Sequence, residues 1–161
     1  MKALLWAAAP ALLITGSPAL AASHEASFLK DALEGDNSEM TLGNIAAHRG
    51  ASASVRQFGR MLAMDHRKGK AQASAVARRL GVPDTDKMAD EAIAERAKLS
   101  RLRGGAFDRE FARYMVKDHH SDIAMFKAEA ATRDRPEVVA LARQTLPVLE
   151  KHLATAESLS K

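Results

Sequence analysis

Apolar residues recur along this chain with the spacing of helices, and no stretch shows the period-two alternation of a half-buried strand. The abundant residue types are good helix formers, whereas aromatic and β-branched residues are few. We predict four long helices at about 23–49, 52–81, 106–132 and 136–160, with a shorter helical stretch at 84–102. This pattern predicts an all-α fold in which the long helices form a four-helix bundle and the short stretch crosses over between the second and the third.

The predicted helices carry start and stop signals. Ser52 or Ser54 can cap the second long helix, and Gly81 in front of a Val-Pro pair ends it. Pro136 is favoured in the first turn of the last helix, and Pro147 inside that helix is expected to kink it. The charged stretch between the second and third long helices is long enough to span a small bundle, so we expect it to run along the outside.

One local pattern occurs twice, 53 residues apart, as FGRMLAMDH in the second long helix and FARYMVKDH in the third. Each copy places an adjacent Asp-His pair, Asp65-His66 or Asp118-His119, on the apolar side of its predicted helix. An ionisable group that is buried without a partner is costly. These pairs therefore need each other or a ligand.

Glu39 in the first long helix has two interpretations. At 100° per residue it points with the core residues of that helix, on the opposite side from His48. Alternatively, Gly35 and Asp36 interrupt the helix, and Asp36 forms a capping box with Glu39 three residues later. The residues alone leave both interpretations open.

Counting from the predicted turns brings polar groups of all four long helices to one depth. Glu39 and His66 lie about equally far from the first turn, and the repeat puts His119 level with His66 if the second and third helices are parallel. His152 falls within about one helical turn of that level. We predict a layer of candidate metal ligands inside the bundle, formed by Glu39, Asp65, His66, Asp118, His119, Asp122 and His152.

The first 21 residues have the composition of a cleaved secretory signal peptide, with one Lys, a long apolar run and small residues at the end. Pro10 and Gly16 interrupt the apolar run, which is shorter than the roughly 20 residues of a spanning helix, so we favour a signal peptide over a membrane anchor. We predict cleavage near Ala21 and a mature domain at 22–161 without an integral membrane segment. The protein is then periplasmic or secreted.

The amino-acid composition limits the types of metal ligand and of binding partner that we expect. The chain has no Cys, which excludes disulfides and thiolate ligands. Its formal net charge of +4 comes from Lys and Arg that are scattered over the solvent faces of the helices, as on an ordinary solvated surface. We expect no nucleic-acid partner for an exported protein. An envelope partner or a second copy of the chain fits better, and the Ala-rich stretch at 71–77 suits close helix packing.

The order of FGRMLAMDH, FDREFARYMVKDHH and QTLPVLEKHL behind a signal peptide resembles an exported bacterial family of unknown function with a ferritin-like four-helix bundle. Its members are labelled outer-membrane or periplasmic proteins. The resemblance covers essentially the whole mature chain. It implies a ferritin-like fold and is compatible with a metal site, and it implies no established reaction.

The ligand pattern departs from that of ferritin-like di-iron centres, which take a Glu from each of two helices and a Glu-x-x-His from each of the other two. No Glu-x-x-His occurs at the predicted layer, which speaks against a ferroxidase or an oxygenase. Three histidines with carboxylates suit a divalent ion such as Zn²⁺, Cu²⁺ or Fe²⁺. An enzyme with a redox-active metal is the one catalytic version that this pattern admits.

A second function needs no metal. The buried polar groups can form a network that only specifies packing in a non-catalytic envelope module. In that case we expect Asp65 to pair with His119 or an Arg, and Asp118 to pair with His66. The sequence leaves a periplasmic metal-binding protein and such a module as open alternatives.

Overall fold

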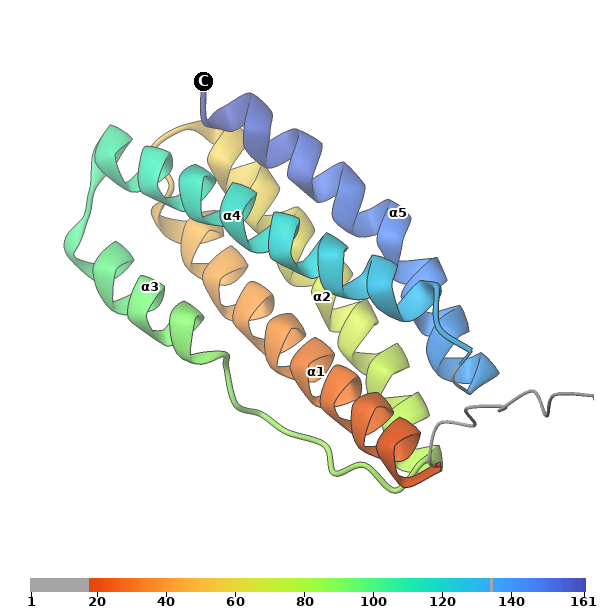
Figure 1. Ribbon diagram of the computed structural model, residues 1–161. Coiled ribbons are helices and arrows are strands. Elements are labelled where there is room, and N and C mark those ends of the chain that lie inside the picture. The colour runs from red at the N-terminus through yellow and green to blue at the C-terminus, as the bar shows by residue number, and fades with distance from the viewer. Residues whose placement is uncertain (1–17, 134) are drawn as a thin grey trace, which may run out of the picture.

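The structure, a computed structural model, describes residues 18–133 and 135–161, and within them it contains five helices and no strand (Figure 1). The prediction of an all-α fold is confirmed for this part of the chain. No helix in it has a stretch both long and apolar enough to cross a membrane. The helices are α1 (Pro18–Arg49), α2 (Ala53–Arg79), α3 (Asp90–Arg101), α4 (Gly104–Ala130) and α5 (Pro136–Leu159).

The first helix differs from the prediction at its start, and it decides between the two interpretations of Glu39. It begins at Pro18, earlier than expected, and most of the predicted signal peptide lies in residues 1–17, outside the described part of the chain. It also continues through Gly35 and Asp36, so of the two interpretations of Glu39 the interrupted helix with a capping box is wrong, and Glu39 is buried with the core residues. The carboxylate of Asp36 does not cap the helix, because it is bonded to His66 on α2.

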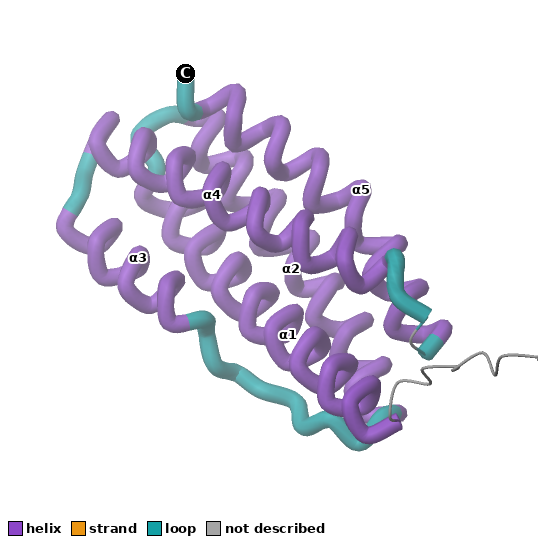
Figure 2. Tube along the Cα trace, in the orientation of Figure 1, coloured by secondary structure: helices purple, strands orange, loops and turns teal. Residues whose placement is uncertain are grey.

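The four long helices lie side by side, and neighbouring helices run in opposite directions (Figure 1). α1 packs against α2, α2 against α5, α5 against α4, and α4 makes fewer contacts with α1. α2 and α4 run in the same direction, because α3 and the long loop before it carry the chain back along the outside of the other helices (Figure 2). This parallel arrangement places the two copies of the Asp-His pattern at similar heights.

The predicted start and end of α2 are confirmed. Ser52 caps the helix, since its hydroxyl oxygen accepts a hydrogen bond from the backbone N–H of Val55 at 3.2 Å. The carboxylate of Asp108 in α4 accepts two more bonds, from the N–H groups of Ala51 and Ser52, each at 2.8 Å. At the other end, Gly81 has a φ of +71°, the left-handed conformation that glycine adopts after a helix.

α1 and α2 approach each other closely at two glycines. A Cβ atom on Gly59 would lie 2.5 Å from the carbonyl oxygen of Gly43 and 2.6 Å from the backbone nitrogen of Ala47. A side chain of any size at this position would therefore push the two backbones apart. The close contact fixes how α1 and α2 slide against each other, and so the relative height of the polar residues further along each helix.

The crossover between α2 and α4 is helical only in its second half, so the predicted helix over 84–102 is wrong in its first part. Residues 82–89 form a loop that is held to α1. The side-chain amide of Asn37 donates hydrogen bonds to the carbonyl oxygens of Thr85 and Lys87, at 2.8 and 2.9 Å. Because these carbonyl oxygens accept hydrogen bonds from α1, they are not used in a helix, and the loop stays extended.

The buried apolar residues form two clusters with a polar layer between them. On α1, Leu33 belongs to one cluster and Leu42 to the other, and Glu39 lies between them. The largest members of the first cluster are Phe28, Leu29, Leu33, Phe126, Leu141 and Leu149. Those of the second are Leu42, Phe58, Leu62, Leu99, Phe107, Phe111, Tyr114 and Met115.

Candidate metal centre

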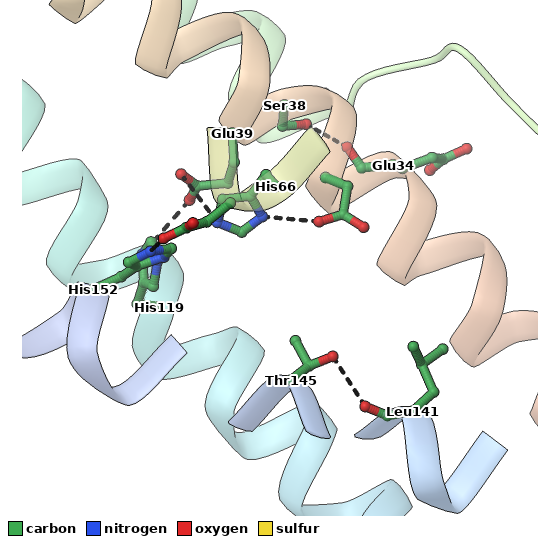
Figure 3. A network of polar contacts seen from close by, with 10 residues as sticks. Glu34, Ser38, Glu39, His66, His119, Leu141, Thr145 and His152 are labelled. Carbon is green, nitrogen blue, oxygen red and sulfur yellow. Dashed lines mark hydrogen bonds and ion pairs between the residues drawn. The ribbon is translucent and has the colours of Figure 1, made fainter. Parts of the chain in front are cut away.

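Four polar side chains, one from each long helix, meet between the two apolar clusters. They are Glu39 of α1, His66 of α2, His119 of α4 and His152 of α5, and at most 6% of any of these residues is exposed. Figure 3 shows the four side chains pointing toward one another. The structure thus brings together four of the seven residues that the sequence predicts as ligands.

The three histidine rings form a nearly regular triangle. Their centroids are 5.3 Å apart for His66 and His152, 5.4 Å for His119 and His152, and 6.0 Å for His66 and His119. One ring nitrogen of each histidine lies within 4.8 Å of a nitrogen of the other two. Three imidazoles this close can serve as one donor set.

Two of the histidines are held from outside by carboxylates. Nδ1 of His66 lies 2.8 Å from Oδ1 of Asp36, and Nε2 of His152 lies 3.0 Å from Oδ2 of Asp65. A carboxylate acceptor requires that the facing ring nitrogen carries the proton. The other nitrogen of each ring, Nε2 of His66 and Nδ1 of His152, therefore presents its lone pair in the neutral form.

The third histidine is held by its own helix. Nδ1 of His119 donates to the backbone carbonyl oxygen of Met115 at 3.0 Å, which leaves the lone pair on Nε2. The three nitrogens that carry these lone pairs are buried, and none has a hydrogen-bond partner in the described part of the chain. Outer hydrogen bonds that fix each tautomer while one nitrogen stays unused are typical of metal-binding histidines.

Glu39 lies against two of the rings without a hydrogen bond. Its Oε1 is 3.5 Å from Nδ1 of His119 and its Oε2 is 3.9 Å from Nε2 of His66. Both oxygens are buried and have no hydrogen-bond partner among the described residues. A fully buried carboxylate in this state is costly, so it points to a missing proton or cation.

Burial shifts the ionisation of this layer toward neutral forms. Loss of solvent, together with the nearby His66 and His152, lowers the pKa of His119 to about 3. Burial lowers the pKa of His152 to about 4, although Asp65 partly opposes this. Burial, followed by the charge of Asp118, raises the pKa of Glu39 well above its ordinary value. Without a cation these shifts favour neutral imidazoles at His119 and His152 and a protonated Glu39.

The remaining three predicted ligands take other places. Asp65 lies outside the triangle as the partner of His152. Asp118 approaches Glu39 and His119, and one oxygen or nitrogen of each of these three residues lies within 4.8 Å of the others. Asp122 lies one turn further along α4, and burial together with Asp118 raises the pKa of its carboxyl well above its ordinary value.

The pairings expected for a network without metal are wrong. Asp65 bonds His152 rather than His119 or an Arg, and His66 is bonded by Asp36 rather than by Asp118. The reason is the neighbourhood of α2, which packs between α1 and α5: Asp65 meets His152 of α5, and His66 meets Asp36 of α1.

Asp36 is the site residue that the sequence does not identify. A signal for it exists at Gly69 on α2, where a Cβ atom would lie only 2.8 Å from Oδ1 of Asp36. A glycine among apolar residues, one turn after His66, marks space for a group from another helix. Asp36 fills that space and orients His66.

A divalent transition ion fits the triangle of histidines. With a metal–nitrogen distance of about 2.1 Å, a ring centroid lies about 3.2 Å from the ion, and three coordinating rings have centroids about 5.2 to 5.6 Å apart. The observed separations run from 5.3 to 6.0 Å. The residues present thus fit an ion with three nitrogen ligands, and Oε2 of Glu39 lies 3.9 Å from one of these nitrogens, Nε2 of His66.

Comparison with known proteins gives a family and a related fold. No curated protein matches the sequence significantly. The chain is similar to the crystal structure of a DUF305 fragment from Deinococcus radiodurans, with 26% identity and a TM-score of 0.74, over 85% of this chain and 95% of that one. The resemblance to a helical family of unknown function is confirmed, because residues 10–159 match the family described as "Domain of unknown function (DUF4142)". The chain belongs to that family.

Proposed function

We propose that the protein is an exported metal-binding protein that holds one divalent transition ion between its four long helices. His66, His119 and His152 would supply nitrogen ligands and Glu39 an oxygen ligand. The single observation that carries this proposal is the set of three buried ring nitrogens without hydrogen bonds, on rings whose centroids lie 5.3 to 6.0 Å apart and whose other nitrogens are already bonded. We interpret the arrangement of the long helices as a ferritin-like four-helix bundle.

The donor set favours a borderline ion over a hard one. Imidazole suits Zn²⁺, Cu²⁺ and Fe²⁺, whereas Mg²⁺ and Ca²⁺ take oxygen ligands. Three nitrogens and one carboxylate complete a tetrahedral shell, and a closed shell is typical of sites that hold a metal rather than use it in catalysis. Metal binding or buffering in the periplasm is therefore the function we favour, and we propose no reaction.

A packing layer without metal is the second candidate. The bonds of Asp36 to His66 and of Asp65 to His152 favour it, because they would orient both rings without an ion. It leaves three ring nitrogens buried without hydrogen bonds, a state that costs free energy and that an ion would relieve. The metal site is for this reason the better account.

Metal analysis tests the proposal directly. Protein expressed without the first 21 residues and purified without chelators is measured by inductively coupled plasma mass spectrometry, and the metal-free form is titrated with Zn²⁺, Cu²⁺ and, without oxygen, Fe²⁺. We expect about one ion per chain, since the donors form one set. His66→Ala and His119→Ala should each weaken binding by two orders of magnitude or more, because each removes one of three nitrogen ligands.

Exposed histidines provide the matched controls. His48→Ala and His120→Ala remove an imidazole from α1 and α4 without touching the layer, since both side chains are exposed. These variants should bind like the unmodified protein. If all four variants bind alike, or if the melting temperature is the same with metal and with chelator, the layer serves packing alone.

A further inference from the structure

Two cavities flank the histidine layer on opposite sides. One, of about 310 Å³, lies between α2 and α5 and borders His66, Asp36 and Asp65. The other, of about 320 Å³, lies between α1 and α4 under the start of α3. We call the second one the acidic cavity, since its charged lining consists of Asp31, Glu34, Glu91, Asp118, Asp122 and one base, Lys117.

The bases near the acidic cavity are already engaged at its rim. Lys117 lies 2.8 Å from Glu91, and Lys30 lies 3.8 Å from Glu34. Among the described residues, no Lys or Arg forms an ion pair with Asp118 or Asp122, the two carboxyls at its inner wall. The inner wall thus carries two acidic side chains without a basic partner in the described part of the chain.

The inner wall leads directly to the buried carboxylate of the layer. Asp118 lines the acidic cavity and also lies next to Glu39, in the group of ligand atoms within 4.8 Å of one another that includes His119. Glu39 is fully buried, and neither of its oxygens has a hydrogen-bond partner. Carboxyl groups therefore follow one another from the acidic cavity to the histidine layer, from Asp118 to Glu39.

The other cavity lacks this continuity of free oxygens. Its two carboxylates are bonded to the histidines that they orient, Asp36 to His66 and Asp65 to His152. Lys68 also lines it and repels an approaching cation. A route from this side would need one of the orienting bonds to break.

We propose that the acidic cavity is the entrance of the metal site, where a hydrated divalent cation first binds to Asp118 and Asp122 and then passes along Glu39 to the histidines. A cleft lined by one sign of charge raises the local concentration of the opposite ion and speeds association. Carboxylate and water oxygens exchange readily on divalent ions, so the first site is weak and the nitrogen site is strong. This inference rests on the proposed metal site.

Kinetics of Zn²⁺ loading test the entrance. Zn²⁺ uptake by the metal-free protein is followed by stopped flow against a fluorescent zinc indicator, and release is followed by transfer to a chelator. The double variant Asp118→Asn, Asp122→Asn should load at least tenfold more slowly and release Zn²⁺ more slowly by the same factor. An entrance lowers both rates together, so the equilibrium dissociation constant stays unchanged.

The control variant carries the same change of charge elsewhere. Glu150→Gln, Glu157→Gln removes two exposed carboxylates from α5, outside the acidic cavity, and should load at the unmodified rate. Raising the ionic strength should slow loading of the unmodified protein and affect the cavity variant less. Circular dichroism checks that the variants are folded, and Asp122→Asn alone, at a partly buried position, repeats the test with a milder change.

The outcomes separate the two proposals. If the unmodified protein binds no metal, the proposed function fails and the entrance fails with it. If it binds Zn²⁺ and the cavity variants load at the control rate, the entrance alone is overturned. If the variants weaken the equilibrium affinity while the loading rate stays unchanged, Asp118 and Asp122 belong to the final site, and the entrance is again overturned.

Discussion

The two Asp-His pairs of the repeated pattern occupy similar places in α2 and α4, yet their residues act differently. In α2, Asp65 turns to α5 and holds His152, while His66 is held by Asp36 of α1. In α4, His119 is held by the carbonyl of its own helix, and Asp118 stays without a histidine partner. The repeat determines the position of each Asp and His along the bundle, and the neighbouring helices determine which partner each side chain binds.

The same lesson holds at two further positions of the repeat. Gly69 corresponds to Asp122, so where α2 leaves space for the carboxylate of Asp36, α4 supplies a carboxylate of its own. Gly59 corresponds to Ala112, which is fully buried on α4. α2 needs glycine there because the backbone of α1 approaches it, whereas Ala112 has room for its methyl group.

Substitutions at Gly59 and Ala112 should give the largest difference in stability between the two copies of the pattern. Gly59→Ala places a methyl group 2.5 Å from a backbone oxygen of α1, so we expect a loss of about 3 kcal/mol of unfolding free energy. Ala112→Gly should cost only about 1 kcal/mol, the difference in helix propensity. Urea denaturation of the metal-free proteins measures both. Equal effects would show that α1 and α2 are not in close contact at this point.

The stability of the metal-free protein should depend on pH, and His119 and Glu39 should contribute to this dependence with opposite signs. His119 has a pKa of about 3 in the folded state and 6.5 in its ordinary state. Between these values the unfolded chain binds more protons, so stability falls as the pH drops, by about 2 kcal/mol from pH 6.5 to 5. Glu39 has a raised pKa, so the folded state binds the extra proton and this group favours folding as the pH drops.

Two variants test these opposite signs. His119→Gln should flatten the fall in stability between pH 6.5 and 5, and Glu39→Gln should steepen it, because each removes one of the two opposing groups. Urea denaturation at several pH values in the presence of chelator provides the measurement, with the exposed His120→Gln as control. Parallel curves for all three variants would mean that neither group is buried in the form described above.

Neutralising Asp65 or Asp118 singly should give the smallest of the expected effects, a difference in the affinity for Zn²⁺. Asp65→Asn weakens the bond that orients His152, so we expect the affinity for Zn²⁺ to fall by about tenfold. Asp118→Asn should leave the equilibrium affinity close to that of the unmodified protein, since Asp118 orients no histidine. Competition titration against a zinc indicator measures both. A larger loss for Asp118→Asn would make it a ligand.

Much of this arrangement could be predicted from the sequence. The long helices, the cap at Ser52 and the stop at Gly81 follow from local patterns that the structure confirms. The convergence of Glu39 with three histidines follows from counting residues between turns, because antiparallel helices convert equal distances from a turn into equal heights. Periodicity and chain length were sufficient for this level of detail.

The rest depends on contacts that no local pattern records. The role of Asp36 depends on Gly69 of another helix, and the extended loop before α3 depends on the side chain of Asn37. The choice of partner for Asp65 depends on which helix packs beside α2. Each of these is a relation between segments distant in sequence, and one sequence read by itself does not contain it.

The polar layer divides the core into two separate apolar clusters. Because of this division, the stability of the proposed metal-binding protein would depend on the supply of metal. In the proposed metal-bound form, an ion held by all four long helices would tie the two halves together and add about 2.7 kcal/mol to the unfolding free energy when free metal exceeds the dissociation constant a hundredfold. Metal-starved chains would open more often and be degraded sooner. The abundance of the protein would then follow the supply of its own ligand, without any regulator of transcription.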